Sequence, residues 1–198
     1  PPQNDDCFDS NYEFDDTLNT WAIRLSHPLA RYLSMTFSIG GYGYCFGGSQ
    51  RGIFDWINDG PLTLPDAVYR YDQAANTWGA RQSMRRGKWF ATAGNINGTG
   101  YVFPGTAETA ESGDNLLTYG YVSRWTEKYN ATLDVWALGP QAPSYYLASF
   151  GCAEAGLSGI TTDGGHYVEL QQATETFRAL AWPTGRLSAS MGMPMEAV

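Results

Sequence analysis

The chain repeats one pattern of residues at a nearly constant spacing, and this repeat constrains its fold more than any single residue does. Residues 14–21 recur 57 positions later as residues 71–78, each with an aromatic-Asp pair at its start and Asn-Thr-Trp at its end. The same spacing relates residues 43–48 to residues 100–105. Two separated blocks that share one offset indicate a duplicated structural unit.

Two further copies extend the repeat. In the third copy, 58 residues on, Tyr129, Asn130 and Trp136 replace Tyr71, Asp72 and Trp78. A weaker fourth copy runs over 168–177, with Phe177 at the tryptophan position. The predicted organisation is a tail or lead-in strand at 1–11 and one domain at 12–198, with units at 12–48, 68–105, 125–165 and 167–198 and inserted loops at 49–67 and 106–121.

Each unit reads as a short antiparallel meander. Val68, Tyr69 and Tyr71 are residue types that fill half-buried strands, and the Asp and Asn side chains at 72–76 favour a turn. Tryptophan then opens the returning strand with a large apolar surface. We therefore expect the repeat tryptophans to be buried equivalents. The predicted structural residues of the repeat are Trp21, Trp78, Trp136, Phe177, Gly47, Gly48, Gly105 and Gly164.

The order of a Gly-Gly pair (Gly47-Gly48), Tyr71-Asp72 and Trp78 resembles the kelch repeat of β-propeller proteins. The resemblance implies an all-β, kelch-type β-propeller of about four blades, each a four-stranded antiparallel sheet. Pro104 and Asn130 depart from the pattern, replacing a Gly and an Asp.

The number of strands that we expect does not determine how such a ring of blades would close. The chain is expected to begin at a third strand and to end after one inner strand of the next blade. Four alternatives follow: imperfect closure, a gap filled by the first ten residues, missing chain, or completion by another subunit.

The composition and net charge of the chain limit the classes of partner that we expect. The chain has 12 Lys and Arg against 20 Asp and Glu, a net charge of −8, which argues against nucleic acid and anionic membrane as partners. A local basic run of Arg81, Arg85, Arg86 and Lys88 is interpreted as a solvated strand edge or turn. The sequence contains no stretch of 18 apolar residues, so it predicts no membrane span. A virion or extracellular surface is favoured over the cytoplasm.

Residues for catalysis are sparse. Neither histidine, His27 or His166, has the spacing of a metal site or of a nucleophile–base pair, so no metal and no cofactor is expected. Of Cys7, Cys45 and Cys152, Cys45 is predicted to be a buried free thiol in a strand, and a disulfide between two of the three remains open.

The sequence favours a non-catalytic binding or structural module with a protein or glycan partner, part of a larger assembly such as a phage or virus particle, with a homo-oligomer allowed. The alternatives are a small sugar-processing enzyme of epimerase or mutarotase type and a fragment of an intracellular adaptor. The candidate binding residues lie in the inserted loops: Arg51, Phe54, Asp55, Trp56, Asp59, Tyr119 and Tyr121.

Overall fold

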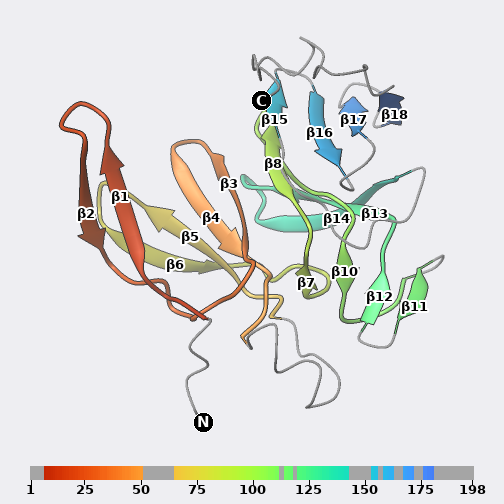
Figure 1. Cartoon of the computed structure of the whole chain (residues 1–198), viewed down its shortest axis with the longest axis horizontal. Helices are drawn as coiled ribbons and strands as arrows, with labels where there is room; N and C mark the ends of the chain where they lie inside the picture. Colours follow the sequence, from red (N-terminus) through yellow and green to blue (C-terminus); the bar gives the residue numbers. More distant parts are fainter. Residues whose placement is uncertain are drawn as a thin grey trace, which may run out of the picture.

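A computed structural model of the chain describes residues 7–50, 65–111, 114–117 and 120–142, and the strands at 153–155, 158–162, 167–171 and 176–180 (Figure 1). All regular elements in these residues are β-strands, and most lie in four-stranded antiparallel sheets. The part of the chain that is described contains no helix that could cross a membrane.

Three of the sheets follow one another along the chain, and each pairs its strands in sequence order. The first comprises β3 (Met35–Ile39), β4 (Tyr42–Phe46), β5 (Val68–Asp72) and β6 (Thr77–Arg81). The second comprises β8 (Ala93–Ile96), β9 (Thr99–Val102), β13 (Trp125–Asn130) and β14 (Val135–Gln141). The third comprises β15 (Ala153–Ala155), β16 (Ser158–Thr162), β17 (Tyr167–Gln171) and β18 (Thr176–Leu180).

A two-stranded hairpin precedes these sheets. It consists of β1 (Asn11–Asp15) and β2 (Thr20–Arg24), which pair only with each other among the described residues. In Figure 1 the hairpin and the sheet β15–β18 lie at opposite ends of the molecule, with the other two sheets between them. The inner strand β8 contacts both β3 and β15. The described strands thus form a series of sheets and no closed ring.

The second inserted segment is not a plain loop, which corrects the expectation for 106–121. It contributes β10 (Thr106–Ala107), β11 (Asn115–Leu117) and most of β12 (Gly120–Val122). With β7 (Lys88–Trp89) these strands form a fourth four-stranded sheet. The register explains why: Thr106 and Ala107 lie between Val122 and Tyr121 on one side and Trp89 and Lys88 on the other, so the insertion returns to pair with the chain before β8.

The repeat turns are built by the same local contacts in each copy. The Oδ1 atoms of Asp15, Asp72 and Asn130 accept backbone N–H bonds from residues two or three positions on, at 2.9 to 3.0 Å. Four residues after each, Asn19, Asn76 and Asp134 adopt left-handed backbone with φ of 51–52°. Asn130 thus accepts the same kind of turn hydrogen bond as the aspartates at the equivalent positions.

Neighbouring sheets are joined by a recurring pair of hydrogen bonds, which we call the clasp. Trp78 Nε1 donates to Leu25 O at 2.9 Å, and Leu25 N donates to Asn76 Oδ1 at 2.9 Å. One repeat later, Trp136 Nε1 donates to Gln82 O at 2.9 Å and Gln82 N donates to Asp134 Oδ1 at 3.0 Å. In each clasp, one residue has both its backbone N–H and its backbone C=O hydrogen-bonded. This residue directly follows the last strand of the preceding sheet.

The first copy has Asn19 and Trp21 at the clasp positions, but no preceding sheet among the described residues provides their hydrogen-bond partner. This corrects the expectation that all the repeat tryptophans are buried. The ring pairs Phe14–Trp21, Tyr71–Trp78 and Tyr129–Trp136 are equivalent, with centroids 4.8–5.0 Å apart. Trp78 and Trp136 are half-buried, whereas Trp21 is 69% exposed. The prediction that Trp21 is buried is wrong, because no described sheet lies against its face of the hairpin.

The main core lies between the sheets β3–β6 and β8–β14. Phe37 stacks on Tyr129 and packs near Trp136, and Tyr44 also contacts Tyr129. The repeat glycines allow the backbones to approach closely: a Cβ on Gly48 would lie 2.6 Å from Tyr32 O, and one on Gly105 would lie 2.7 Å from Ala91 Cβ. Gly47, also buried, has a φ of 60°. Gly164 lies outside the described residues.

Candidate functional site

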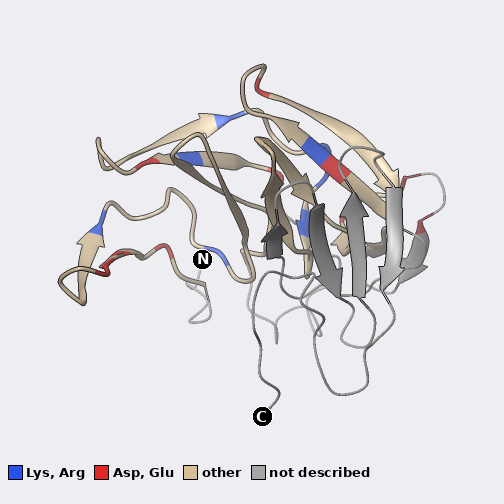
Figure 2. Ribbon diagram, turned by 90° about the horizontal axis from the view of Figure 1, so that it is seen from above, with Lys and Arg blue, Asp and Glu red and all other residues tan. Residues whose placement is uncertain are grey.

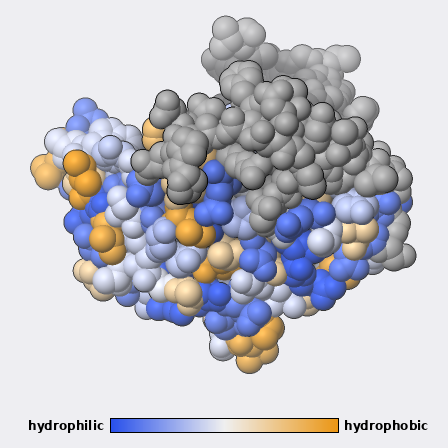
Figure 3. All heavy atoms as spheres, turned by 90° about the horizontal axis from the view of Figure 1, so that it is seen from below, coloured by the Kyte–Doolittle hydropathy of each residue, from blue (hydrophilic) through white to orange (hydrophobic). Residues whose placement is uncertain are grey.

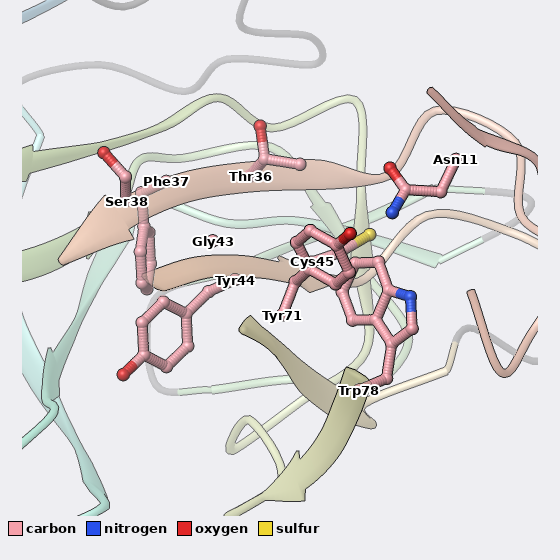
Figure 4. A pocket seen from close by; sticks show the side chains of 9 residues that line it. All are labelled: Asn11, Thr36, Phe37, Ser38, Gly43, Tyr44, Cys45, Tyr71 and Trp78. Carbon is pink, nitrogen blue, oxygen red and sulfur yellow. The ribbon is translucent and has the colours of Figure 1, made fainter. Parts of the chain in front are cut away.

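The candidate site is a groove between the hairpin β1–β2 and the sheet β3–β6. The strand register places Thr36, Ser38, Cys45, Tyr71 and Trp78 on one face of this sheet. Together with Asn11 of β1 they line an open cavity of about 580 Å³ (Figure 4). Aromatic rings and short polar side chains therefore share one accessible surface.

The groove is open because the surface above Gly43 is uncovered. A Cβ on Gly43 would have as its nearest neighbour Tyr71 Cβ at 3.8 Å. At the equivalent Gly100, a Cβ would lie 2.5 Å from the ring of Phe37, which comes from the preceding sheet. Accordingly Tyr129 is fully buried, while the equivalent Tyr71 is half-buried. The cavity above Gly43 corresponds to the volume that inner-strand aromatics fill one repeat later.

No described element covers the outer face of the hairpin either. Tyr12 pairs with Ile23 and Phe14 pairs with Trp21, so all four side chains share the face that carries Tyr71 and Trp78 in the next sheet. Their exposed fractions range from 46% for Phe14 to 79% for Ile23. Figure 3 shows apolar residues at this end of the molecule. We call these four residues the hairpin face.

A smaller pocket of about 180 Å³ adjoins the groove and contains a buried cation. The Arg31 guanidinium donates to Gly47 O at 2.5 Å and to Ala67 O at 2.9 Å, and its residue is 6% exposed. Burial lowers the pKa of Arg31. The pocket is lined by Phe8, Ser10, Asn11, His27, Leu29, Arg31, Ser34, Thr36, Cys45 and Trp78.

Lys88 is the equivalent of Arg31 one repeat later. It donates to Trp125 O, which corresponds to Ala67 O, and its ammonium lies 3.2 Å from Glu127 Oε1. Burial lowers the pKa of Lys88, and the Glu127 carboxylate opposes that shift. Arg86 joins this buried group through Asp114 at 2.5 Å and Ser123 Oγ at 2.7 Å.

The interpretation of the basic run as solvated is therefore wrong for two of its members. Arg86 is 4% exposed and Lys88 is fully buried, because Asp114 and Glu127 neutralise them inside the protein. Arg85 fits the expectation, since it pairs with Glu111 at the surface. Figure 2 shows basic and acidic residues dispersed over the described strands, with no large patch of either sign on that part of the chain.

Two further groups in the smaller pocket can titrate. Burial lowers the pKa of His27; the positive charge of Arg31 adds to the shift, while the carbonyl of Leu29 and the charge of Asp9 oppose it. The ring of His27 packs edge-on against Tyr69 and Trp78. Burial raises the pKa of the Cys45 thiol. Cys45 carries a free thiol and is half-buried.

Most of the predicted binding residues cannot be placed in this groove. Arg51, Phe54, Asp55, Trp56, Asp59 and Tyr119 lie outside the described residues. Tyr121 lies half-buried in β12, opposite Ala107 and Leu116, and is not part of the groove. Phe177 pairs with Leu170 in the outer hairpin of the sheet β15–β18, as its place in the repeat predicts.

Sequence reasoning missed the groove and the buried cations. The signal for the cations was present, since Arg31 and Lys88 stand 57 residues apart and so follow the repeat spacing. The described residues contain no group of three or more His, Cys, Asp and Glu placed to hold a metal ion.

Comparisons with known proteins add a likeness in fold. No protein-family model matches the chain, and no curated protein matches it in sequence. A solved structure described as "Structure of YjhT" matches with a TM-score of 0.65 and 16% sequence identity, over 91% of this chain and 67% of that one. At this identity the likeness concerns the fold alone.

Proposed function

We propose that this protein is a kelch-type β-propeller module without catalytic activity, which acts by binding protein and belongs to a larger assembly. The support for the propeller is the succession of four-stranded sheets that repeat one turn and one clasp. Such sheets bury their faces by packing against one another in series.

The observation that carries the binding role is the hairpin face. Of its equivalents one repeat later, Trp78 donates to Leu25 O at the end of the hairpin, and Tyr71 lines the groove beside it. In the following repeat, Tyr129 and Trp136 pack against the sheet β3–β6. The hairpin face has no such cover in the described residues. Contiguous apolar surface of this kind marks a protein interaction site.

The occupant that we propose is a second copy of the chain, packed head to tail. The described series of sheets has a neighbour on only one side at each end, at the hairpin and at β15–β18. In this arrangement the end sheet of one copy covers the hairpin face of the next. Trp21 then donates to the backbone carbonyl that follows an outer strand, and Asn19 accepts from the N–H of the same residue, as in the two clasps. Head-to-tail contacts of this kind build closed rings or filaments.

The test is Ile23→Lys, measured by light scattering after size exclusion. Ile23 is 79% exposed, so the change leaves the folded chain intact but places a charge on the hairpin face. The matched control is Leu133→Lys, which adds the same charge at a residue that is 68% exposed in a turn away from that face. We expect Ile23→Lys to lower the association state and Leu133→Lys to leave it unchanged. Equal behaviour of the two variants would exclude the hairpin face as the interface.

A further inference from the structure

The pocket beside the groove holds a buried cation, Arg31, and the charge of Asp66 acts on it from beyond ion-pair distance. Among the described residues no carboxylate forms an ion pair with Arg31, although carboxylates pair with Arg24, Arg85, Arg86 and Lys88. Arg31 Nε and His27 Nε2 are both buried and have no hydrogen-bond partner. A buried charge and unpaired polar atoms are costly unless a partner neutralises them.

The repeat indicates which kind of group is missing. Arg31 and Lys88 occupy equivalent positions, and each donates to a carbonyl at the start of a third strand: Ala67 directly precedes β5, and Trp125 is the first residue of β13. Lys88 is neutralised by Glu127, but the residue equivalent to Glu127 is Tyr69, whose ring centre lies 6.0 Å from Arg31 Cζ. The first unit therefore keeps the cation and replaces the carboxylate with a phenol.

The pocket has room and polarity for the missing group. Its volume of about 180 Å³ exceeds what a carboxylate with one or two attached carbons needs. Ser10, Asn11, Ser34 and Thr36 supply short polar side chains, and Phe8, Leu29 and Trp78 supply apolar wall. A guanidinium binds carboxylates well because its planar donors match their geometry.

We propose that this pocket is a binding site for a small carboxylate molecule, with Arg31 as the charged anchor and His27 as a second polar contact. The site is independent of the association proposed above, since it lies on the other side of the hairpin from the hairpin face.

The experiment titrates the folded chain with sodium acetate at constant ionic strength, balanced with sodium chloride, and uses acetamide as the uncharged control of the same shape. Two quantities are followed: the Tm and the ¹⁵N–¹H signal of Arg31 Nε. We expect the Tm to rise by about 3–5 °C when acetate is tenfold above its Kd. We also expect the Arg31 Nε signal to shift with acetate and not with acetamide.

Two variants of Tyr69 distinguish binding of acetate in this pocket from binding elsewhere on the chain. Tyr69→Glu supplies the carboxylate that Glu127 provides one repeat later, so it is expected to remove the response to acetate. Tyr69→Gln has the same size without the charge and is expected to keep the response. An unchanged Arg31 Nε signal in the natural chain would overturn the proposal. So would an equal response of Tyr69→Glu and Tyr69→Gln, because acetate would then bind elsewhere.

Discussion

Single residues repeat their roles from one sheet to the next, so their contributions can be compared within one chain. Trp136 is half-buried, contacts Phe37, Phe46 and Tyr129, and makes a clasp hydrogen bond. Trp21 packs against Phe14, which is equivalent to Tyr129, but it is 69% exposed. The sequence predicts that both tryptophans are buried equivalents and misses this difference, because exposure depends on whether a second sheet covers the face.

Substitution of these two tryptophans measures that difference. Trp136→Ala is expected to lower the free energy of unfolding by about 3–5 kcal/mol, the usual cost of removing a packed aromatic side chain. Trp21→Ala is expected to cost less than about 1 kcal/mol, as for most surface substitutions, at protein concentrations where the chain is monomeric. Urea unfolding followed by circular dichroism gives both values. Equal losses would contradict the assignment of Trp21 to an uncovered face.

Histidine 27 makes the stability of the fold depend on pH. In the folded chain burial lowers the pKa of this ring and the charge of Arg31 adds to the effect, while Leu29 O and Asp9 oppose it. The unfolded chain therefore binds a proton at a higher pH than the folded chain does. Stability from this group is fully present above the unfolded pKa of about 6.5 and is lost as the pH falls below it, by up to about 1.4 kcal/mol per pH unit.

The variant His27→Gln isolates this contribution. We expect the natural chain to lose more stability than His27→Gln between pH 7.5 and pH 5, measured by urea unfolding at each pH. Identical pH profiles of the two proteins would show that His27 does not titrate differently on folding.

The strand elements follow the sequence closely where local rules decide them. The turn at Gly40-Gly41 joins β3 and β4, and both glycines have positive φ, a conformation that glycine adopts without strain. The strands of the insertion at 106–121 could not be predicted by such rules, because β10 is two residues long and pairs with β7, which precedes it by many residues, and with β12. The buried charges of Arg86 and Lys88 escaped prediction for the same reason, since Asp114 and Glu127 approach them only in the folded chain.

Packing between sheets is tested by the two equivalent glycines. Gly100→Ala places a methyl group 2.5 Å from the Phe37 ring and is expected to destabilise the fold by about 1–3 kcal/mol. Gly43→Ala meets only Tyr71 Cβ at 3.8 Å, and alanine is better than glycine inside a strand, so we expect a gain of about 0.5 kcal/mol. Thermal unfolding of both variants gives the comparison. A loss at Gly43 similar to that at Gly100 would mean that the groove is filled.

At the scale of the molecule, the described residues form a series of similar sheets, and none of these residues covers the hairpin face. The repeat in the sequence was enough to predict a series of short antiparallel units, and the resemblance to kelch repeats implied four strands in each. The repeat also raised the question of how the series ends. It did not locate the groove, since that surface exists only because the hairpin has two strands where the next sheets have four. We propose that the hairpin face is an interface between copies of the chain and that assembly is what the protein does.

The mass of the purified chain in solution, determined by light scattering after size exclusion, tests this claim most directly. The account predicts a species of at least twice the 21.8 kDa of one chain, which Ile23→Lys reduces to a single chain. A natural chain that remains a 21.8 kDa monomer at concentrations up to the highest that it tolerates would contradict the account, because the hairpin face would then have no second copy to cover it.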